Sequence, residues 1–151
     1  MEYLDEAREE IKRVDHLVYV SLKYTRTVDV IKSVVERIIN SFNFVILELL
    51  EFAKSKKKIK DYPVAPGLRC DTLNNVFSDN DELKEYLAFY QLLRRISRAD
   101  YTKREEYRRH VTMITNLDDG EVLEVHIDLL QEYYTKTKAF VEFAKNLVEN
   151  D

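Results

Sequence analysis

Glycine and proline are so scarce in this chain that they divide it into a few long uninterrupted stretches. The 151 residues contain two of each, at Pro63, Pro66, Gly67 and Gly120. Both residue types commonly interrupt regular structure, so the first stretch, residues 1–62, favours helix strongly. This lack of interruptions limits the fold to one built mainly from long helices.

Apolar residues in the first stretch recur at the spacing of an amphipathic helix and predict two helices. One stripe covers residues 4–18 and a second covers residues 31–52, each with alternating three- and four-residue steps. Between them, residues 24–27 read YTRT, and β-branched threonines with N-cap character favour a break. We therefore expect antiparallel helices over about 3–23 and 28–57. One continuous helical arm is the less favoured alternative.

Two capping signals follow in the middle of the chain. Asp79 with Glu82 has the spacing of a capping box and predicts the start of a helix that continues into a basic segment. Thr102 with Glu105 repeats this spacing. The repeat predicts a break near Asp100 and a further short helix through about Arg109.

Residues 110–127 differ from the rest because they are rich in β-branched residues around Asp118-Asp119-Gly120. We predict a small β-hairpin whose loop puts Gly120 in the left-handed conformation. The predicted register places one set of side chains on one face: Val111, Met113, Thr115, Leu123, Val125 and Ile127. It places a second set on the other: Thr112, Ile114, Glu124 and His126.

The last helix is expected over about 129–149, capped by Asp128 with Gln131. It carries two apolar stripes, so it is either central or buries one face in a partner. With a short helix over about 69–76, these elements predict a mainly α protein. Its architecture is an antiparallel four-helix-type bundle with short extra helices and the small hairpin, in a single domain over 1–151.

Composition excludes several classes of site. Cys70 is the single cysteine, so a disulfide within the chain and a cysteine-based zinc site are excluded. His16, His110 and His126 lack metal-ligand spacing, and we expect neither a metal nor a cofactor. The charged opening residues do not resemble a signal peptide, and no apolar run reaches the roughly 20 residues of a membrane span. We expect a cytoplasmic protein without membrane contact. Abundant Glu, Lys and Ile suggest a thermophilic source.

The stretch from Arg94 to His110 concentrates positive charge on an otherwise acidic chain. It holds seven Arg or Lys against three acids, whereas the whole chain has a formal net charge of −4. Such a segment suggests a contact site for an anion, although ion pairing with nearby acids is an equally simple interpretation. Arg104 and His110 are candidate catalytic residues because they are close enough in sequence to serve one phosphate. The candidate phosphate- or RNA-binding residues are Arg94, Arg95, Arg98, Arg108 and Arg109.

The segment Leu92–Tyr101, LLRRISRADY, ends in Ala-Asp-Tyr. Together with the preceding helical hairpin and Pro/Gly loop, it resembles the HEPN superfamily of small helical-bundle proteins. Catalytic members of that superfamily are metal-independent ribonucleases with an Arg-x4–6-His motif. The resemblance allows two placements. Arg104-x5-His110 has the required residues but follows the Ala-Asp-Tyr, whereas Arg95-x4-Asp100 has the expected position but aspartate in place of histidine.

Two functional hypotheses remain from the sequence. In the first, the protein binds RNA or a nucleotide through Arg94–His110 and is a metal-independent ribonuclease or a toxin-type component. There, His110 acts as general acid or base, with Arg104 and Arg95 holding the phosphate. In the second, it is a non-catalytic interaction module whose last helix packs against a partner. We expect a homodimer, and the HEPN resemblance also implies a nucleotidyltransferase-type protein partner.

Overall fold

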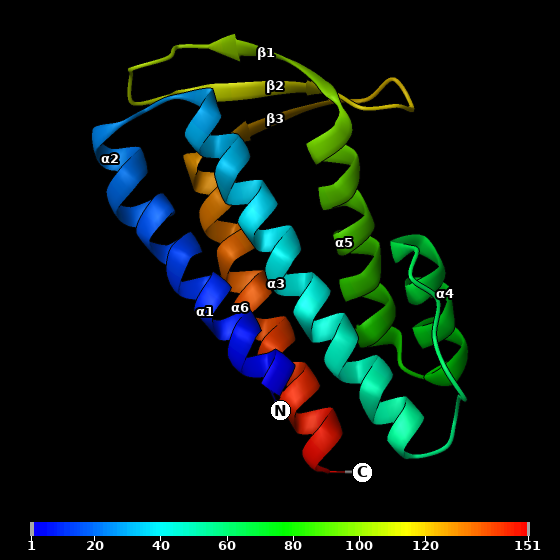
Figure 1. The fold of residues 1–151 in the computed structure, drawn as a ribbon. Coiled ribbons are helices and arrows are strands. Elements are labelled where there is room, and N and C mark those ends of the chain that lie inside the picture. Colours follow the sequence, from blue (N-terminus) through cyan, green and yellow to red (C-terminus); the bar gives the residue numbers. More distant parts are fainter. Residues whose placement is uncertain (1, 151) are drawn as a thin grey trace.

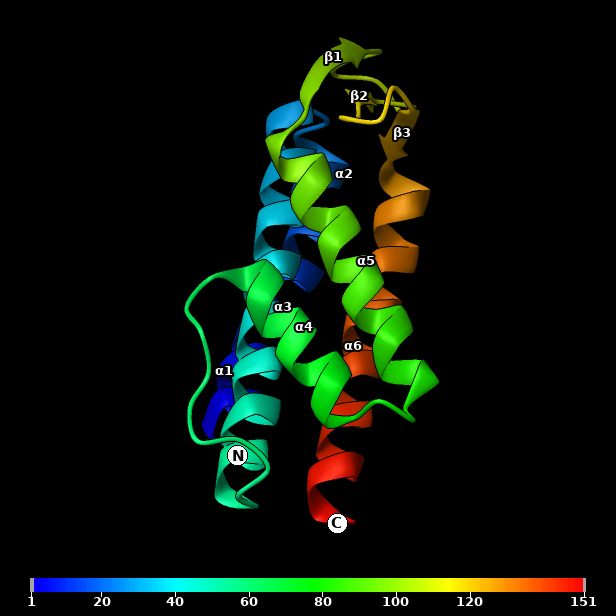
Figure 2. The ribbon, with the colours of Figure 1, turned by 90° about the vertical axis from the view of Figure 1, so that its right-hand side faces the viewer.

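Four long helices, alternating in direction, form the body of the protein in a computed structural model that describes residues 2–150 (Figure 1). A small sheet lies across one end of this bundle, and the first long helix begins and the last one ends at the opposite end (Figures 1 and 2). The predicted mainly α class, with a helical bundle and a small hairpin, is confirmed. The long helices are α1 (Glu2–His16), α3 (Val28–Ser55), α5 (Asp81–Arg98) and α6 (Ile127–Glu149).

The first two predicted helices are confirmed, with the break where the threonines favour it. Helix α1 continues through a π-helical turn, η1 (Leu17–Ser21), into the short α2 (Leu22–Tyr24). The Thr27 hydroxyl then accepts a hydrogen bond from the Val30 N–H at 3.3 Å and caps α3. A π-helical turn widens a helix locally and is often found at functional sites.

The next two helices begin at different residues from those predicted. The short α4 (Pro66–Val76) starts three residues early because Pro66 fits the first helical turn, where its missing N–H costs nothing. Helix α5 is capped by Asn80, whose side chain accepts a hydrogen bond from the Leu83 N–H at 2.9 Å. Asp79 was therefore the wrong cap, by one residue.

The predicted hairpin and its register are confirmed. Strands β2 (Thr112–Asn116) and β3 (Val122–His126) pair antiparallel, with Met113 opposite Val125 and Thr112 opposite His126. Gly120 has a φ of +87° and closes the loop by donating to the Leu117 carbonyl. The set of side chains that includes Val111, Met113 and Val125 is buried and therefore faces the helices, as the alternating pattern indicates.

The short helix predicted before the hairpin is wrong, because the segment forms a third strand. Strand β1 (Asp100–Arg104) pairs antiparallel with β2, giving the sheet order β1-β2-β3. Glu105 follows with a φ of 54°, a left-handed conformation that no α-helix can contain. The capping-box spacing of Thr102 and Glu105 is coincidental, since tertiary pairing with β2 determines the structure here.

Helix α6 begins two residues earlier than predicted and has a different cap. His126 Nδ1 accepts a hydrogen bond from the Leu129 N–H at 3.2 Å, so His126, not Asp128, is the N-cap. The helix packs on both α1 and α3, and the residues of both apolar stripes contact the core. The central position of α6 therefore explains both of its apolar stripes by contacts within the chain.

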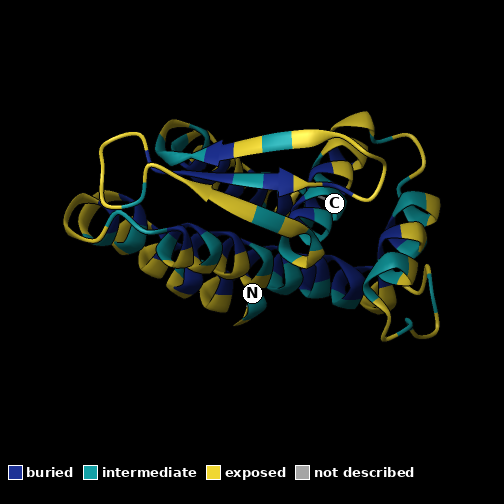
Figure 3. Cartoon of the chain, turned by 90° about the horizontal axis from the view of Figure 1, so that it is seen from above, coloured by how far each residue is buried: buried dark blue, intermediate teal, exposed yellow. Residues whose placement is uncertain are grey.

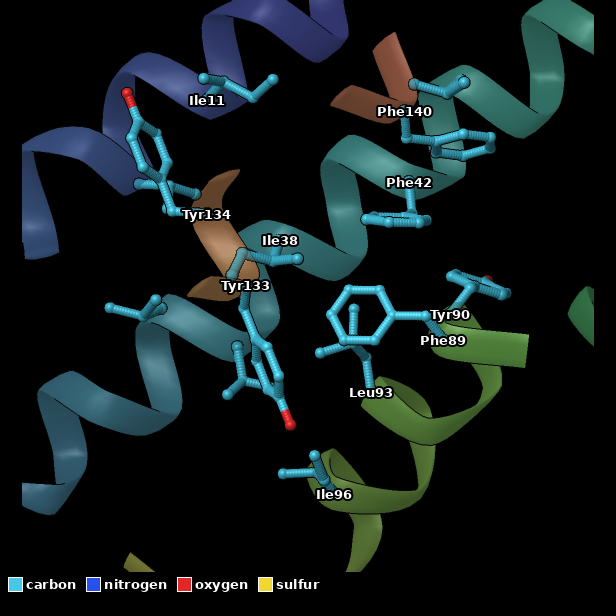
Figure 4. Close-up of a cluster of buried hydrophobic side chains, with 14 of the residues drawn as sticks. Ile11, Ile38, Phe42, Phe89, Tyr90, Leu93, Ile96, Tyr133, Tyr134 and Phe140 are labelled. Atoms are coloured by element: carbon cyan, nitrogen blue, oxygen red, sulfur yellow. The ribbon is translucent and has the colours of Figure 1, made fainter. Parts of the chain in front are cut away.

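Aromatic rings fill the space between the helices (Figure 4). Phe42 on α3 stacks on Phe140 of α6 with ring centroids 4.7 Å apart, and it also contacts Phe89 and Tyr90 of α5. Tyr133 on α6 meets Phe89 edge-on at 4.8 Å. These large rings join α5 to the other helices and form a continuous core with their neighbours.

The sheet covers the end of the bundle with its central strand buried and its outer strands largely exposed (Figure 3). Met113, Thr115 and Val125 are buried on the inner face, and β2 packs on α3. The outer face and the β1–β2 loop lie at the same end as the α2–α3 turn (Figure 1). None of the helices within residues 2–150 is both long and apolar enough to cross a membrane.

Candidate functional site

A cleft of about 620 Å³ lies at the sheet end of the bundle, between η1, α2, the sheet and the start of α6. We call it the basic cleft because four cationic side chains and two histidines line it, against a single carboxylate, Asp128. The cationic and histidine side chains are Lys23, Arg26, Arg104, Arg109, His110 and His126. The two predicted catalytic residues, Arg104 and His110, thus line one cleft, together with Arg109.

The β1–β2 loop brings Arg109 and His110 to this cleft because it is tied to the α2–α3 turn. Glu106 Oε2 accepts a hydrogen bond from the Val28 N–H at 2.8 Å, and so caps the start of α3 from a distant part of the chain. The Tyr107 N–H donates to the Arg26 carbonyl at 2.7 Å. Tyr107 has a φ of 66°, a costly conformation for this residue type, which these contacts hold in place.

Arg104 is placed by the sheet register. It pairs with Thr112, which in turn pairs with His126, so these three residues form one row across the sheet, with Thr112 buried at its centre. The Arg104 guanidinium forms an ion pair with Glu124 on β3, and both side chains are about half exposed. One positive charge of the basic cleft is therefore partly balanced before any ligand binds.

Arg26 has an unused hydrogen-bond donor in the basic cleft. Its Nε atom is buried and has no hydrogen-bond partner within the described part of the chain. A buried guanidinium N–H without an acceptor is costly and uncommon.

The hydrogen bonding of His126 determines where its proton lies. Its Nδ1 accepts from the Leu129 N–H, so in the neutral ring the proton is on Nε2. The ring thus carries one donor that is not used by the helix cap. His110 is exposed and lies in the β1–β2 loop, two residues before β2 begins.

The other predicted phosphate-binding residues do not line the basic cleft. The Arg95 Nε and Nη2 atoms each lie 2.9 Å from a carboxylate of the hairpin loop, Asp118 and Asp119 respectively. Hydrogen bonds to these two groups raise the pKa of Arg95. Arg94 lies over the ring of Tyr90, with its guanidinium carbon 5.9 Å from the centroid. Arg98 and Arg108 are exposed.

Sequence reasoning missed several residues of the basic cleft. Lys23 ends the first predicted helix, and Arg26 lies in the segment interpreted only as a helix break. His126 was interpreted as a residue of the hairpin and Asp128 as a helix cap. Charge was a weak signal for the first pair, since both lie next to an exposed turn. No spacing in the sequence connects these residues with Arg104, because three separate segments converge here.

Other reactive groups lie outside this site. Burial raises the pKa of the Cys70 thiol to about 11, so Cys70 remains protonated and serves as a small core residue. Within residues 2–150, no three His, Cys, Asp or Glu side chains gather as metal ligands.

Comparisons with known proteins found no match: no family model, no curated protein and no solved structure is significantly similar to this chain. The HEPN resemblance therefore stays a prediction.

Proposed function

We propose that this protein binds the phosphate of RNA or of a nucleotide in the basic cleft and cleaves RNA without a metal ion. The convergence of four cations and two histidines on one cleft carries this proposal. Arginine binds phosphate oxygens through two parallel hydrogen bonds, and three arginines, Arg26, Arg104 and Arg109, line the cleft.

A histidine in the basic cleft can supply both proton transfers that RNA cleavage needs. A base takes the proton from the ribose 2′-hydroxyl, and the 2′-oxygen then attacks the adjacent phosphorus. The bond from phosphorus to the 5′-oxygen breaks, and an acid protonates that leaving oxygen. We assign both transfers to His110, which takes the 2′-hydroxyl proton as the base and returns it, as the acid, to the leaving 5′-oxygen. Because Nδ1 of His126 caps helix α6, this ring only donates a hydrogen bond, from its Nε2–H, to a phosphate oxygen. Arg104 stabilises the negative charge that develops on the phosphate oxygens, with Arg109 beside it.

Incubation of the full chain with labelled RNA in EDTA tests the catalytic proposal. We expect the parent protein to cleave the RNA and the Arg104→Ala, His110→Ala double variant to be inactive. Arg95→Ala is the matched control, since it removes an arginine of the same basic segment that lies outside the cleft. Equal loss of cleavage in the control would contradict the site assignment.

Non-catalytic binding is the second candidate, and the ion pair of Arg104 with Glu124 favours it. A guanidinium already engaged by a carboxylate stabilises developing charge less effectively than a free one. On this alternative, RNA binds and weakens steeply with salt, but no cleavage follows. The homodimer and the nucleotidyltransferase-type partner stay predictions, and light scattering of the purified chain tests the first of them.

A further inference from the structure

A second cleft, of about 1020 Å³, opens beside the basic one and has the opposite charge. We call it the acidic cleft. It lies between α5 and α6, and its walls include Glu82, Glu85 and Glu132 against one lysine, Lys136. The two clefts share three lining residues, Tyr19, Asp128 and Gln131. The two clefts therefore adjoin one another, a cationic one beside an anionic one, and we call them the joined clefts.

This polarity limits what can occupy the joined clefts. A phosphate is attracted to the cationic end, but a second phosphate further along would meet the carboxylates and be repelled. An RNA backbone therefore cannot continue through both clefts. The suitable occupant has one phosphate and, next to it, an uncharged part that carries hydrogen-bond donors. A single nucleotide, free or at the end of an RNA, has this distribution.

Tyr19 provides a flat surface at the junction of the two clefts. The π-helical turn η1 carries it, and its side chain is 47% exposed. The ring is supported from one side by Tyr134, which meets it edge-on with centroids 5.7 Å apart. An exposed, supported tyrosine is a typical stacking surface for a nucleobase.

Asp128 and Gln131 supply the hydrogen bonds that distinguish one base from another. They are three residues apart on α6, so both side chains project from the same face of the helix. A carboxylate offers two acceptor oxygens and no donor. Guanine alone among the common bases presents two adjacent donors, N1–H and N2–H, on its pairing edge. Adenine would place its N1 acceptor against the carboxylate. Gln131 can donate to the guanine O6.

We propose that the joined clefts bind a guanine nucleotide, with its phosphate in the basic cleft, its base on Tyr19 and its pairing edge on Asp128. This inference rests on the proposed phosphate-binding function and adds the base that the site selects.

Calorimetric titration of the full chain at low salt with GMP, AMP and CMP tests the proposal, beside inorganic phosphate. We expect GMP to bind about tenfold or more tightly than AMP and CMP. Asp128→Asn should abolish that preference, whereas inorganic phosphate should bind at least as tightly as to the parent protein, because a carboxylate of the basic cleft is lost. Asp81→Asn is the matched control, because Asp81 is also an exposed aspartate in the first turn of a helix but lines neither cleft.

The outcomes separate this inference from the function beneath it. Equal binding of GMP, AMP and CMP would overturn guanine selection while leaving phosphate binding in place. No binding of any nucleotide, of phosphate or of RNA would overturn both. If Asp128→Asn fails to fold, Tyr19→Leu replaces it, and its loss of GMP affinity should exceed any change in the affinity for inorganic phosphate. RNA hexamers with guanine at one end or in the middle distinguish a free nucleotide from an RNA terminus, since an internal guanine should not be selected.

Discussion

Arg95 and Arg109 belong to one basic stretch of the sequence, yet the fold uses its two halves differently. At the helical half, Arg95 is held by the carboxylates of Asp118 and Asp119 and connects α5 to the hairpin loop. At the loop half, Arg109 lies in the basic cleft with Arg26 and Lys23. The difference shows that positive charges clustered along a sequence can be divided by the fold, some held in ion pairs with carboxylates and others gathered in a cleft with a single carboxylate, Asp128.

The largest expected effect is a loss of RNA affinity, which substitutions in the loop half should cause and those in the helical half should not. Replacing both Arg104 and Arg109 by alanine should weaken RNA binding by about 30-fold or more at low salt, because two phosphate contacts are lost. The slope of log affinity against log salt should fall by roughly two. Fluorescence anisotropy with a labelled oligonucleotide measures both quantities.

The double variant Arg94→Ala, Arg95→Ala is the matched control, since it removes two positive charges of the same segment outside the cleft. We expect it to bind RNA almost as well as the parent protein. A loss as large as that of the cleft variant would break the distinction between the two halves.

The next effect concerns the contact that keeps the loop half in place. Glu106→Ala should lower the free energy of unfolding by about 1–2 kcal/mol, because the Val28 N–H at the start of α3 loses its acceptor. RNA affinity should fall as well, since the loop carries Arg109 and His110. Urea denaturation and anisotropy provide the two measurements.

Glu106→Gln is the informative control for this contact because its amide oxygen still accepts the hydrogen bond. We expect it to retain most of the stability that alanine loses. If alanine and glutamine variants were equally unstable, charge near the helix start, rather than the hydrogen bond, would be the cause.

Removing Arg95 from the helical half should have a smaller effect, on thermal stability, and this effect should depend on pH. The hydrogen bond from the Glu121 N–H, together with that from Arg95, lowers the pKa of Asp119 below its ordinary value of 3.8. A carboxyl whose pKa is lowered on folding stabilises the protein above its unfolded pKa and loses this contribution as pH falls through the folded value. Arg95→Ala should therefore lower Tm slightly at neutral pH, and the difference should vanish in acid.

Lys12→Ala serves as the comparison for that experiment. Lys12 also forms a 2.9 Å ion pair, with Glu9, but it engages one carboxylate where Arg95 engages two. Its effect on Tm should be smaller at every pH. An Arg95→Ala effect that persists unchanged at a pH well below the lowered pKa of Asp119 would indicate that packing, not the carboxylates, accounts for it.

The elements that the sequence predicted well are those determined by local signals. The stripes around Leu4 and Ile31 predict α1 and α3, and the alternation around Gly120 predicts the hairpin with its register. Helix starts were less accurate, because neighbouring residues such as Asp79 and Asn80 are nearly equivalent as caps.

The segment after Arg98 could not be predicted locally because distant parts of the chain determine its conformation. Strand β1 exists because β2 offers an edge to pair with, and its loop is held by a contact between Glu106 and Val28, which are 78 residues apart. The candidate site likewise depends on contacts between distant parts of the chain. Arg104 and His110 were expected to act together, but Arg26 and His126 join them only through the tertiary fold.

The smallest expected effect tests whether Glu124 competes with a ligand for Arg104 or positions it. Glu124→Gln removes a negative charge beside the basic cleft, so RNA affinity should rise about two- to fivefold at low salt and approach that of the parent protein near 1 M salt. Glu121→Gln on the same hairpin is the control, because it removes an equal charge from an exposed residue that does not line the cleft. A fall in affinity with Glu124→Gln would instead mean that the carboxylate holds Arg104 in its binding position. The basic cleft would then hold two kinds of arginine: Arg104, which a carboxylate orients, and Arg109, which would bind without one.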